Sequence, residues 1–249
     1  MQQQKSYKIL LIGDSCIDEY VYGTCDRLNP EAPVPILKFS RKEIKNGMAW
    51  NVKDNLQSFG IEVNMITNSE KIFKTRYIDE RYNQQILRVD VEDTLSPTQY
   101  QVTNEKYDAI VISDYNKGFI TEQKLFEIVF NSKIPVFVDS KKTILPESNC
   151  YIKINESESK LLRSKHNNLI ITKGSDGAEY DGINYSGEKV SVFDVCGAGD
   201  TFLSALVYFY LECGTIEKAI PFANKAASVA VQNFGTYVLT VDDINEICC

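Results

Sequence analysis

The sequence predicts an α/β fold built on a doubly wound, mostly parallel sheet. Short apolar runs of strand length alternate along the chain with longer stretches of helical periodicity. Such alternation is typical of parallel strands that are covered by helices on both faces of the sheet. Neither an internal repeat nor a linker rich in Pro, Ser or Gly divides the 249 residues. We therefore expect a single domain over residues 1–249.

The expected elements follow from these runs in chain order. The strands of the main sheet are predicted at 7–12, 61–66, 109–112, 134–138, 150–154 and 169–172. Helices are predicted at 49–59, 121–130, 199–211 and 216–234, with another between the last two strands, and Thr121 is the expected N-cap of its helix. Two shorter alternating segments, 34–39 and 85–91, favour a small accessory sheet.

Composition and charge exclude several classes of protein. The net charge of −7 argues against nucleic acid as the main partner. No apolar run approaches the roughly 20 residues that span a bilayer. Seven cysteines, an odd number without C-x-x-C spacing, favour reduced thiols over a disulfide framework or a zinc site. We expect a cytoplasmic protein with small-molecule partners.

The stretch V-C-G-A-G-D-T-F at 195–202 carries the strongest chemical signal. Gly197, Ala198 and Gly199 leave their amides unobstructed at the start of an apolar helix, where free N–H groups favour an anion. Asp200 stands in the same turn, and a carboxylate beside a bound phosphate could take a proton from an attacking hydroxyl. The alternative is an ordinary helix start with an acidic first turn.

Polar residues also follow several of the predicted strands, as in Gly13-Asp14, Ser113-Asp114, 139–141, 155–158 and 172–174. Ligands of doubly wound sheets bind at the carboxyl ends of the strands. Acids, amides and lysines gathered there suit magnesium, phosphate and a hydroxylated substrate, although each could be simple loop chemistry. The motifs of P-loop, dinucleotide-binding and protein-kinase folds are absent from the sequence.

With these motifs the chain resembles the ribokinase-like (PfkB) carbohydrate kinases along nearly its whole length. Within that family it is most similar to the heptose 7-phosphate kinase domain of ADP-heptose synthesis for surface polysaccharide. The resemblance is carried by G-A-G-D-T-F at 197–202, N-x-x-E at 155–158, P-E-A-P-V-P at 30–35, Q-Q-I-L-R-V-D at 84–90 and S-D-Y-N-K-G at 113–118.

The resemblance implies ATP-dependent phosphorylation of the anomeric hydroxyl of D-glycero-D-manno-heptose 7-phosphate, giving the 1,7-bisphosphate. Asp200 would be the general base, and the amides of Gly197, Ala198 and Gly199 would form the anion hole. Asn155 and Glu158 would organise Mg²⁺ through water, although helix capping is an alternative role for both. The nucleotide would lie beside Lys173, Gly174 and Asn224, of which Asn224 could also be purely structural.

The sugar site is expected at other strand ends. Carboxylates and amides suit vicinal hydroxyls, and glycine lets the backbone approach the sugar. The candidates for the sugar are Asp14, Asp18, Gly47 and Asn51, although Asp14 could instead be a turn residue. Arg88, Lys117 and Lys141 would hold a sugar phosphate or the γ-phosphate, unless they are simply solvated.

The family also implies a β lid, expected at about 17–40 and 74–92, through which homodimers commonly form. Two features depart from the family pattern. Met48 and Trp50 are bulky where small residues are usual, and one crossover unit is missing before residue 74, so that the sheet should lose an outer strand. Another sugar or sugar-phosphate kinase, or a degenerate non-catalytic nucleotide- or sugar-binding protein, therefore stays open as an alternative.

Overall fold

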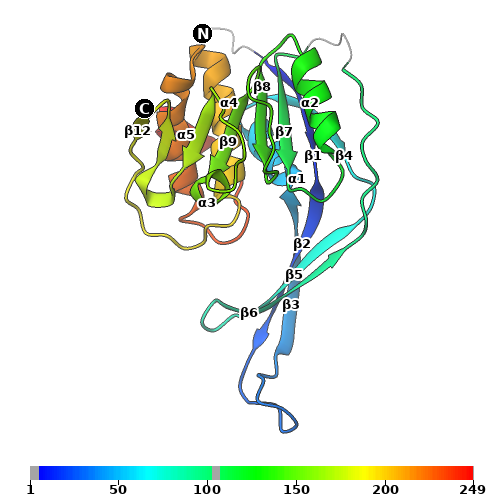
Figure 1. Cartoon of the computed structure of the whole chain (residues 1–249). Helices are drawn as coiled ribbons and strands as arrows, with labels where there is room; N and C mark the ends of the chain where they lie inside the picture. The colour runs from blue at the N-terminus through cyan, green and yellow to red at the C-terminus, as the bar shows by residue number, and fades with distance from the viewer. Residues whose placement is uncertain (1–5, 103–106, 249) are drawn as a thin grey trace.

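Two sheets form the framework of the protein. The structure is a computed structural model that describes residues 6–102 and 107–248. The body holds an eight-stranded sheet in the order β12-β11-β10-β9-β8-β7-β1-β4, and a four-stranded sheet in the order β3-β2-β5-β6 projects from it as a lid (Figure 1). The body strands are β1 (Lys8–Gly13), β4 (Glu62–Thr67), β7 (Ala109–Asp114), β8 (Val136–Ser140), β9 (Tyr151–Asn155), β10 (Leu169–Thr172), β11 (Ala178–Tyr180) and β12 (Ile183–Tyr185). The strands from β10 to β4 are parallel, whereas β11 and β12 add an antiparallel hairpin at the edge.

Helices bury both faces of the body sheet, which explains why its central strands are continuously apolar. Ile9 and Leu11 of β1 face one core, and Leu10 and Ile12 face a second core on the opposite side of the sheet. The helices that pack on the first core are α1 (Ala49–Ser58), α4 (Ala198–Cys213), α5 (Ile216–Ala230) and α6 (Val241–Cys248). Helix α2 (Glu122–Asn131) packs on the second core.

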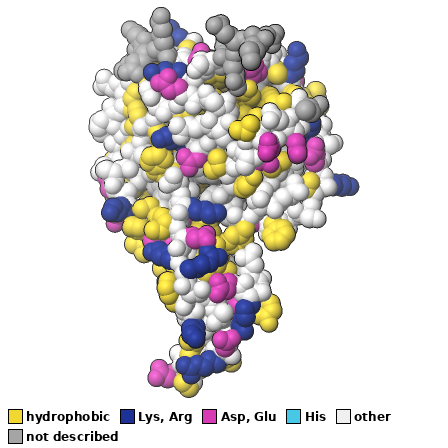
Figure 2. Space-filling view, turned by 180° about the vertical axis from the view of Figure 1, so that it is seen from behind, with side chains coloured by type: hydrophobic (Ala, Val, Ile, Leu, Met, Phe, Trp, Pro, Cys, Tyr) yellow, Lys and Arg dark blue, Asp and Glu magenta, His cyan; other side chains and the backbone are white. Residues whose placement is uncertain are grey.

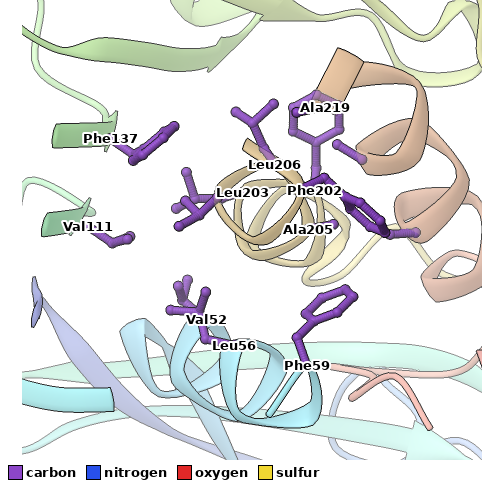
Figure 3. Close-up of a cluster of buried hydrophobic side chains, with 14 of the residues drawn as sticks. Val52, Leu56, Phe59, Val111, Phe137, Phe202, Leu203, Ala205, Leu206 and Ala219 are labelled. Atoms are coloured by element: carbon purple, nitrogen blue, oxygen red, sulfur yellow. The ribbon is translucent and has the colours of Figure 1, made fainter. Parts of the chain in front are cut away.

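Helix α4 lies at the centre of the larger core. Figure 3 shows Leu203 between the sheet residues Val111 and Phe137 and the α1 residue Val52. The Ser204 hydroxyl also donates to the Val52 carbonyl oxygen at 3.1 Å, which fixes α4 against α1. The start of α4 is therefore held rigidly over the carboxyl ends of the strands.

The lid sheet has two chemically different faces, because successive side chains of a strand point to opposite sides. In one row, Lys45, Asp18, Lys74 and Asp90 are paired across the four strands, and in the next row Ile44, Glu19, Thr75 and Val89 are paired. In the middle of β2, Asp18, Tyr20 and Tyr22 are buried toward the body, whereas the residues between them are partly exposed. Figure 2 shows charged side chains along the projecting lid with hydrophobic side chains beside them. The lid strands are β2 (Ser15–Thr24), β3 (Lys38–Met48), β5 (Ile72–Asp79) and β6 (Gln84–Glu92).

Most predicted elements are present. Thr121 caps α2 as expected, accepting a hydrogen bond from the Lys124 amide at 3.1 Å. The strand predicted at 34–39 is only partly present: residues 34–37 form a loop with a single bridge between Leu28 and Pro35, since proline has no N–H to offer a strand ladder, and residues 38–39 begin β3. The expected helix after β9 is only the four-residue α3 (Glu156–Ser159).

The lid also extends further than the expected 17–40 and 74–92, since β3 continues to Met48. Strand β4 forms one edge of the body sheet, and only residues 68–71 separate it from β5 of the lid. Among the residues that the structure describes, no helix combines the length and the apolar character needed to cross a membrane.

Candidate active site

The turn into α4 presents backbone N–H groups to the space above the sheet. Gly197 has φ +77°, and a Cβ at this position would lie 2.6 Å from Asn51 Nδ2, so only glycine fits. Within the described chain the amides of Gly197, Gly199 and Asp200 make no hydrogen bond, whereas the Ala198 amide donates to the Val195 carbonyl oxygen at 3.3 Å. The anion hole expected from Gly197, Ala198 and Gly199 stays a prediction, and of these three amides that of Ala198 is already hydrogen-bonded.

The Asp200 carboxylate is 4% exposed and is held by two neutral donors. Asn51 Nδ2 donates to Oδ2 at 3.0 Å, and the Tyr115 hydroxyl donates to Oδ1 at 2.7 Å. Burial raises the pKa of Asp200 to about 6, although both hydrogen bonds lower it. A carboxylate with such a pKa is ionised at neutral pH and can still accept a proton from a hydroxyl.

The two donors are themselves fixed. Asn55 Nδ2 donates to Asn51 Oδ1 at 3.3 Å and to the Tyr237 carbonyl oxygen at 3.1 Å, which turns the Asn51 amide so that its NH₂ group faces Asp200. Burial raises the pKa of Tyr115 well above its usual value, so its hydroxyl remains a donor. The sequence motif at 113–118 contained Tyr115, but nothing in the pattern assigned it to the base.

The predicted sugar-binding acids Asp14 and Asp18 differ in their hydrogen-bond and ion-pair partners. Asp14 is fully buried, its Oδ2 accepts the Lys117 amide at 3.1 Å, and its Oδ1 has no hydrogen-bond partner within the described residues. Burial raises the pKa of Asp14. Asp18 instead forms a buried ion pair with Arg76 of β5. A Cβ on Gly47 would lie 2.0 Å from Asp18 Oδ2, which explains the glycine there.

The three predicted phosphate-binding cations are placed differently from one another. Arg88 is paired with Asp90 on the lid at 2.9 Å, and the Lys117 ammonium is paired with Glu92. Lys141 lines a cavity of about 180 Å³ above the sheet, with its ammonium 4.6 Å from the centre of the Tyr115 ring. Only Lys141 of the three therefore reaches the cavity that contains Asp200.

That cavity also contains the residues predicted to organise magnesium. Asn155 and Glu158 form a reciprocal capping box: the Glu158 amide donates to Asn155 Oδ1 at 2.8 Å and the Asn155 amide to Glu158 Oε2 at 2.9 Å. The alternative reading as helix caps is thus realised. Because Glu158 Oε1 takes no part in the box, an oxygen donor remains that suits hydrated Mg²⁺. Within residues 6–102 and 107–248, this cavity included, no three His, Cys, Asp or Glu side chains gather to hold a metal directly.

A buried ion pair completes the cavity and was not anticipated from the sequence. Lys153 Nζ lies 2.6 Å from Asp139 Oδ2. Burial acts to lower the pKa of Lys153, but the carboxylates of Asp139, Asp200 and Glu158 outweigh it, so that the pKa is raised. A lysine two residues before Asn155 on an apolar strand was the only available signal.

A larger cavity of about 410 Å³ adjoins the first at Gly199, which lines both. Gly174 and Asn224, predicted to bind nucleotide, line it, and Asn224 Nδ2 donates to the Tyr185 carbonyl oxygen at 2.9 Å. Lys173 is not among its lining residues and pairs with Glu179. Apolar side chains dominate the wall, as suits a nucleotide base: Val190, Val192, Val195, Phe202, Ala227 and Val231.

The two bulky residues of the Gly47–Asn51 turn are not part of the walls of these cavities. Met48 is buried in the core, with φ 59° as the residue before α1. Trp50 is half-buried, and the Lys53 ammonium lies 4.6 Å from its ring centre. Neither side chain lines either cavity.

Comparisons with known proteins agree with this geometry. The chain is 30% identical to the bifunctional protein HldE of Nitratiruptor sp. and 31% identical to that of Sulfurimonas denitrificans. Both alignments cover 96% of this chain and 64% of the relative. The chain thus spans less than two thirds of these relatives. The first alignment covers 297 positions, more than the 249 residues of this chain.

Solved structures share the fold. A ribokinase from Thermotoga maritima matches with a TM-score of 0.73 over 97% of this chain and 99% of that chain, at 16% identity. Phosphofructokinase-2 from Escherichia coli matches with a TM-score of 0.70 over 97% of this chain and 98% of that chain, at 15% identity. The ribokinase-like fold predicted from the sequence is thereby confirmed.

The model of the pfkB family carbohydrate kinases matches residues 52–243, which include the α4 turn, the capping box and the nucleotide-side cavity. The chain therefore belongs to the pfkB family of carbohydrate kinases and is an ATP-dependent sugar kinase.

Proposed function

We propose that the protein transfers the γ-phosphoryl group of ATP to the anomeric hydroxyl of D-glycero-D-manno-heptose 7-phosphate, giving the 1,7-bisphosphate. One observation carries the choice of chemistry. The buried Asp200 carboxylate lies beside free backbone amides, in a cavity that adjoins the nucleotide-sized one at Gly199. The choice of sugar rests on the motifs at 30–35, 84–90 and 113–118 and on the relatives named HldE.

In the proposed reaction Asp200 takes the proton of the sugar hydroxyl as its oxygen attacks the γ-phosphorus. The bond between that phosphorus and the β-phosphate oxygen breaks, and ADP leaves. The amides of Gly197, Gly199 and Asp200 stabilise charge on the transferring group. Magnesium, held through water by Asn155 and Glu158, would neutralise phosphate charge when bound. Asp14 Oδ1, buried without a partner among the described residues, would accept a sugar hydroxyl. Such a reaction belongs in the cytoplasm, where ATP is made.

The proposal is tested by incubating the protein with ATP and a panel of phosphorylated and free sugars and measuring ADP release. We expect heptose 7-phosphate to give the highest kcat/KM. Asp200→Asn should keep the fold and nucleotide affinity but lose turnover by about a hundred- to ten-thousand-fold. A different best sugar would favour another kinase of the family. Tight ATP binding without ADP release from any sugar would favour the non-catalytic alternative.

Activity should depend on pH through Asp200. Because the carboxylate is the active form and its pKa is raised to about 6, kcat/KM should be constant above that pH and fall tenfold per unit below it. Tyr115→Phe removes a hydrogen bond that lowers this pKa, so the falling limb should move to higher pH. A phosphorylated sugar also titrates near pH 6, but its limb would not move in the variant. A limb at the same pH in both proteins would therefore exclude Asp200.

Magnesium dependence separates the two readings of Glu158. Glutamine can still accept the Asn155 amide in the capping box, so Glu158→Gln should leave the melting temperature nearly unchanged. It removes the negative charge, and the Mg²⁺ concentration that gives half-maximal activity should rise several-fold. A lower melting temperature with unchanged magnesium dependence would mean that Glu158 serves only as a cap.

We further propose a homodimer through the lid strands. Ile44 and Leu87 on the outward face are 66% and 55% exposed, and Val89 and Val91 share that face. A small sheet with one apolar face open gains stability when that face is covered. By size-exclusion chromatography with light scattering, the parent protein should be a dimer and Ile44→Asp a monomer. Leu161→Asp, at a body residue that is 63% exposed, is the matched control and should remain a dimer. A monomeric parent protein would refute the proposal.

A further inference from the structure

Lys142, two residues after β8, is a largely buried cation that the proposed mechanism does not use. Its side chain is 9% exposed, and its ammonium lies 2.8 Å from Oδ2 of Asp114, the last residue of β7. The Asp114 side chain is fully buried. Taking two charges out of water is costly even when they attract each other, and apolar side chains could pack there at least as well. The pair therefore calls for an explanation.

The ion pair fastens the turn that follows β7. The Lys142 ammonium also donates to Asn116 Oδ1 at 3.1 Å, and the Asn116 amide donates to Asp114 Oδ1 at 2.9 Å. The Ser140 hydroxyl, at the end of β8, donates to Asp114 Oδ2 at 2.6 Å. Asn116 has φ +58°, which is uncommon outside glycine, and this ring of contacts holds the turn in that shape.

The fastened turn lies over Asp14, the buried acid that follows β1. Gly13 and Ser113 are partners in the pairing of β1 with β7, so Asp14 and Asp114, the residues after them, are neighbours. The Lys117 amide of the turn donates to Asp14 Oδ2 at 3.1 Å. Oδ1 of Asp14, which has no partner among the described residues, is the atom proposed to accept a sugar hydroxyl.

The two charges of the ion pair act on Asp14 in opposite directions. Burial is the main cause that raises the pKa of Asp14, the Asp114 carboxylate raises it further, and the Lys142 ammonium lowers it. Asp14 further contacts backbone groups of neighbouring elements: the amides of Lys117 and Tyr115 in the turn, the Ser113 carbonyl oxygen in β7 and the Ala49 amide in α1. Without Lys142, Asp14 would therefore face an uncompensated negative charge.

We propose that Lys142 is a positioning residue for Asp14. It neutralises Asp114 and fixes the turn whose amides hold the Asp14 carboxylate, so that Asp14 keeps the negative charge with which it would accept a sugar hydroxyl. A carboxylate makes a stronger, charge-assisted hydrogen bond than a protonated acid does. The inference rests on the proposed placement of Asp14 in the sugar site, but not on which sugar is bound. Lys142 itself touches no substrate and exchanges no proton.

Titration of Asp14 without sugar or nucleotide tests the charge effect directly. Aspartate carboxyl groups are labelled with ¹³C, and the Asp14 signal, assigned from Asp14→Asn, is followed against pH by NMR. Lys142→Gln keeps an N–H donor for Asp114 but removes the charge, so the Asp14 midpoint should move to higher pH. Asp114→Asn removes the opposing charge, so the midpoint should move to lower pH. In Asp114→Asn/Lys142→Gln the two effects should cancel. Lys160→Gln, at an exposed lysine, is the control.

Kinetics with the best sugar of the panel connect this charge to binding. At neutral pH, Lys142→Gln should raise the KM for the sugar about tenfold, as expected for the loss of one charge-assisted hydrogen bond, with a smaller effect on kcat. A higher pH should restore KM because Asp14 ionises again, whereas a mere distortion of the turn would not respond to pH. The double variant and Lys160→Gln should keep the parent KM.

An Asp14 midpoint that is the same in Lys142→Gln and the parent, with both proteins folded by their melting curves, would overturn the proposal and leave Lys142 a structural partner of Asp114. A rise of KM that no pH reverses would do the same. Should Lys142→Gln not fold, the downward shift in Asp114→Asn and its reversal in the double variant carry the test.

The titration separates this inference from the proposed function. It contains neither sugar nor ATP, so failure of heptose 7-phosphate as the substrate would leave its result intact. A shifted Asp14 midpoint with an unchanged KM would support the effect of Lys142 on Asp14 and would contradict only the placement of Asp14 in the sugar site.

Discussion

Burial of the Asp200 carboxylate is the constraint on which the rest of the site depends. A carboxylate out of water must be hydrogen-bonded or neutralised, and here two neutral donors, Asn51 and Tyr115, meet that need without cancelling its charge. Both donors must be held at fixed distances, so α1 is fastened to α4 through Ser204 and the Asn51 amide is oriented by Asn55. The glycine at 197 follows from the same requirement, because a side chain there would displace Asn51.

The other acidic groups at this edge of the sheet are treated differently. Asp18, Asp114 and Asp139 each have a cation of their own, namely Arg76, Lys142 and Lys153. Each of these ion pairs holds a cation in place at the edge of the sheet. Asp14 and Asp200 receive hydrogen bonds only from neutral groups, and burial raises the pKa of both. The structure therefore distinguishes two buried carboxylates that have neutral donors from three that are paired with cations.

The sequence predicted those parts of the molecule that depend on local pattern. The apolar strands, the cap at Thr121 and the glycine-rich start of α4 are encoded over a few residues, so their positions could be read directly. The positions of Tyr115 and Lys153 depend on contacts that are distant in sequence. Tyr115 donates to Asp200, 85 positions away, and Lys153 lines the same cavity as Asp200, 47 positions away. Likewise, a pattern of cations could not reveal that Lys117 is already paired with Glu92, 25 positions away. Long-range pairing decides which of several plausible charges remains available.

The lid illustrates how one short strand can serve two surfaces at once. Alternation along β2 sends Asp18 and Tyr20 toward the body, while Glu19 faces the open side. The Asp18–Arg76 pair joins β2 to β5 on the inward face. Tyr20 lies against Phe234, whose carbonyl oxygen accepts Lys45 Nζ from β3 at 3.4 Å. A register shift of one residue would bury the outward residues against the site and expose these contacts. The same strands thus carry both the inward contacts and the outer face, so a partner on the proposed dimer surface would contact strands that also pack against the body.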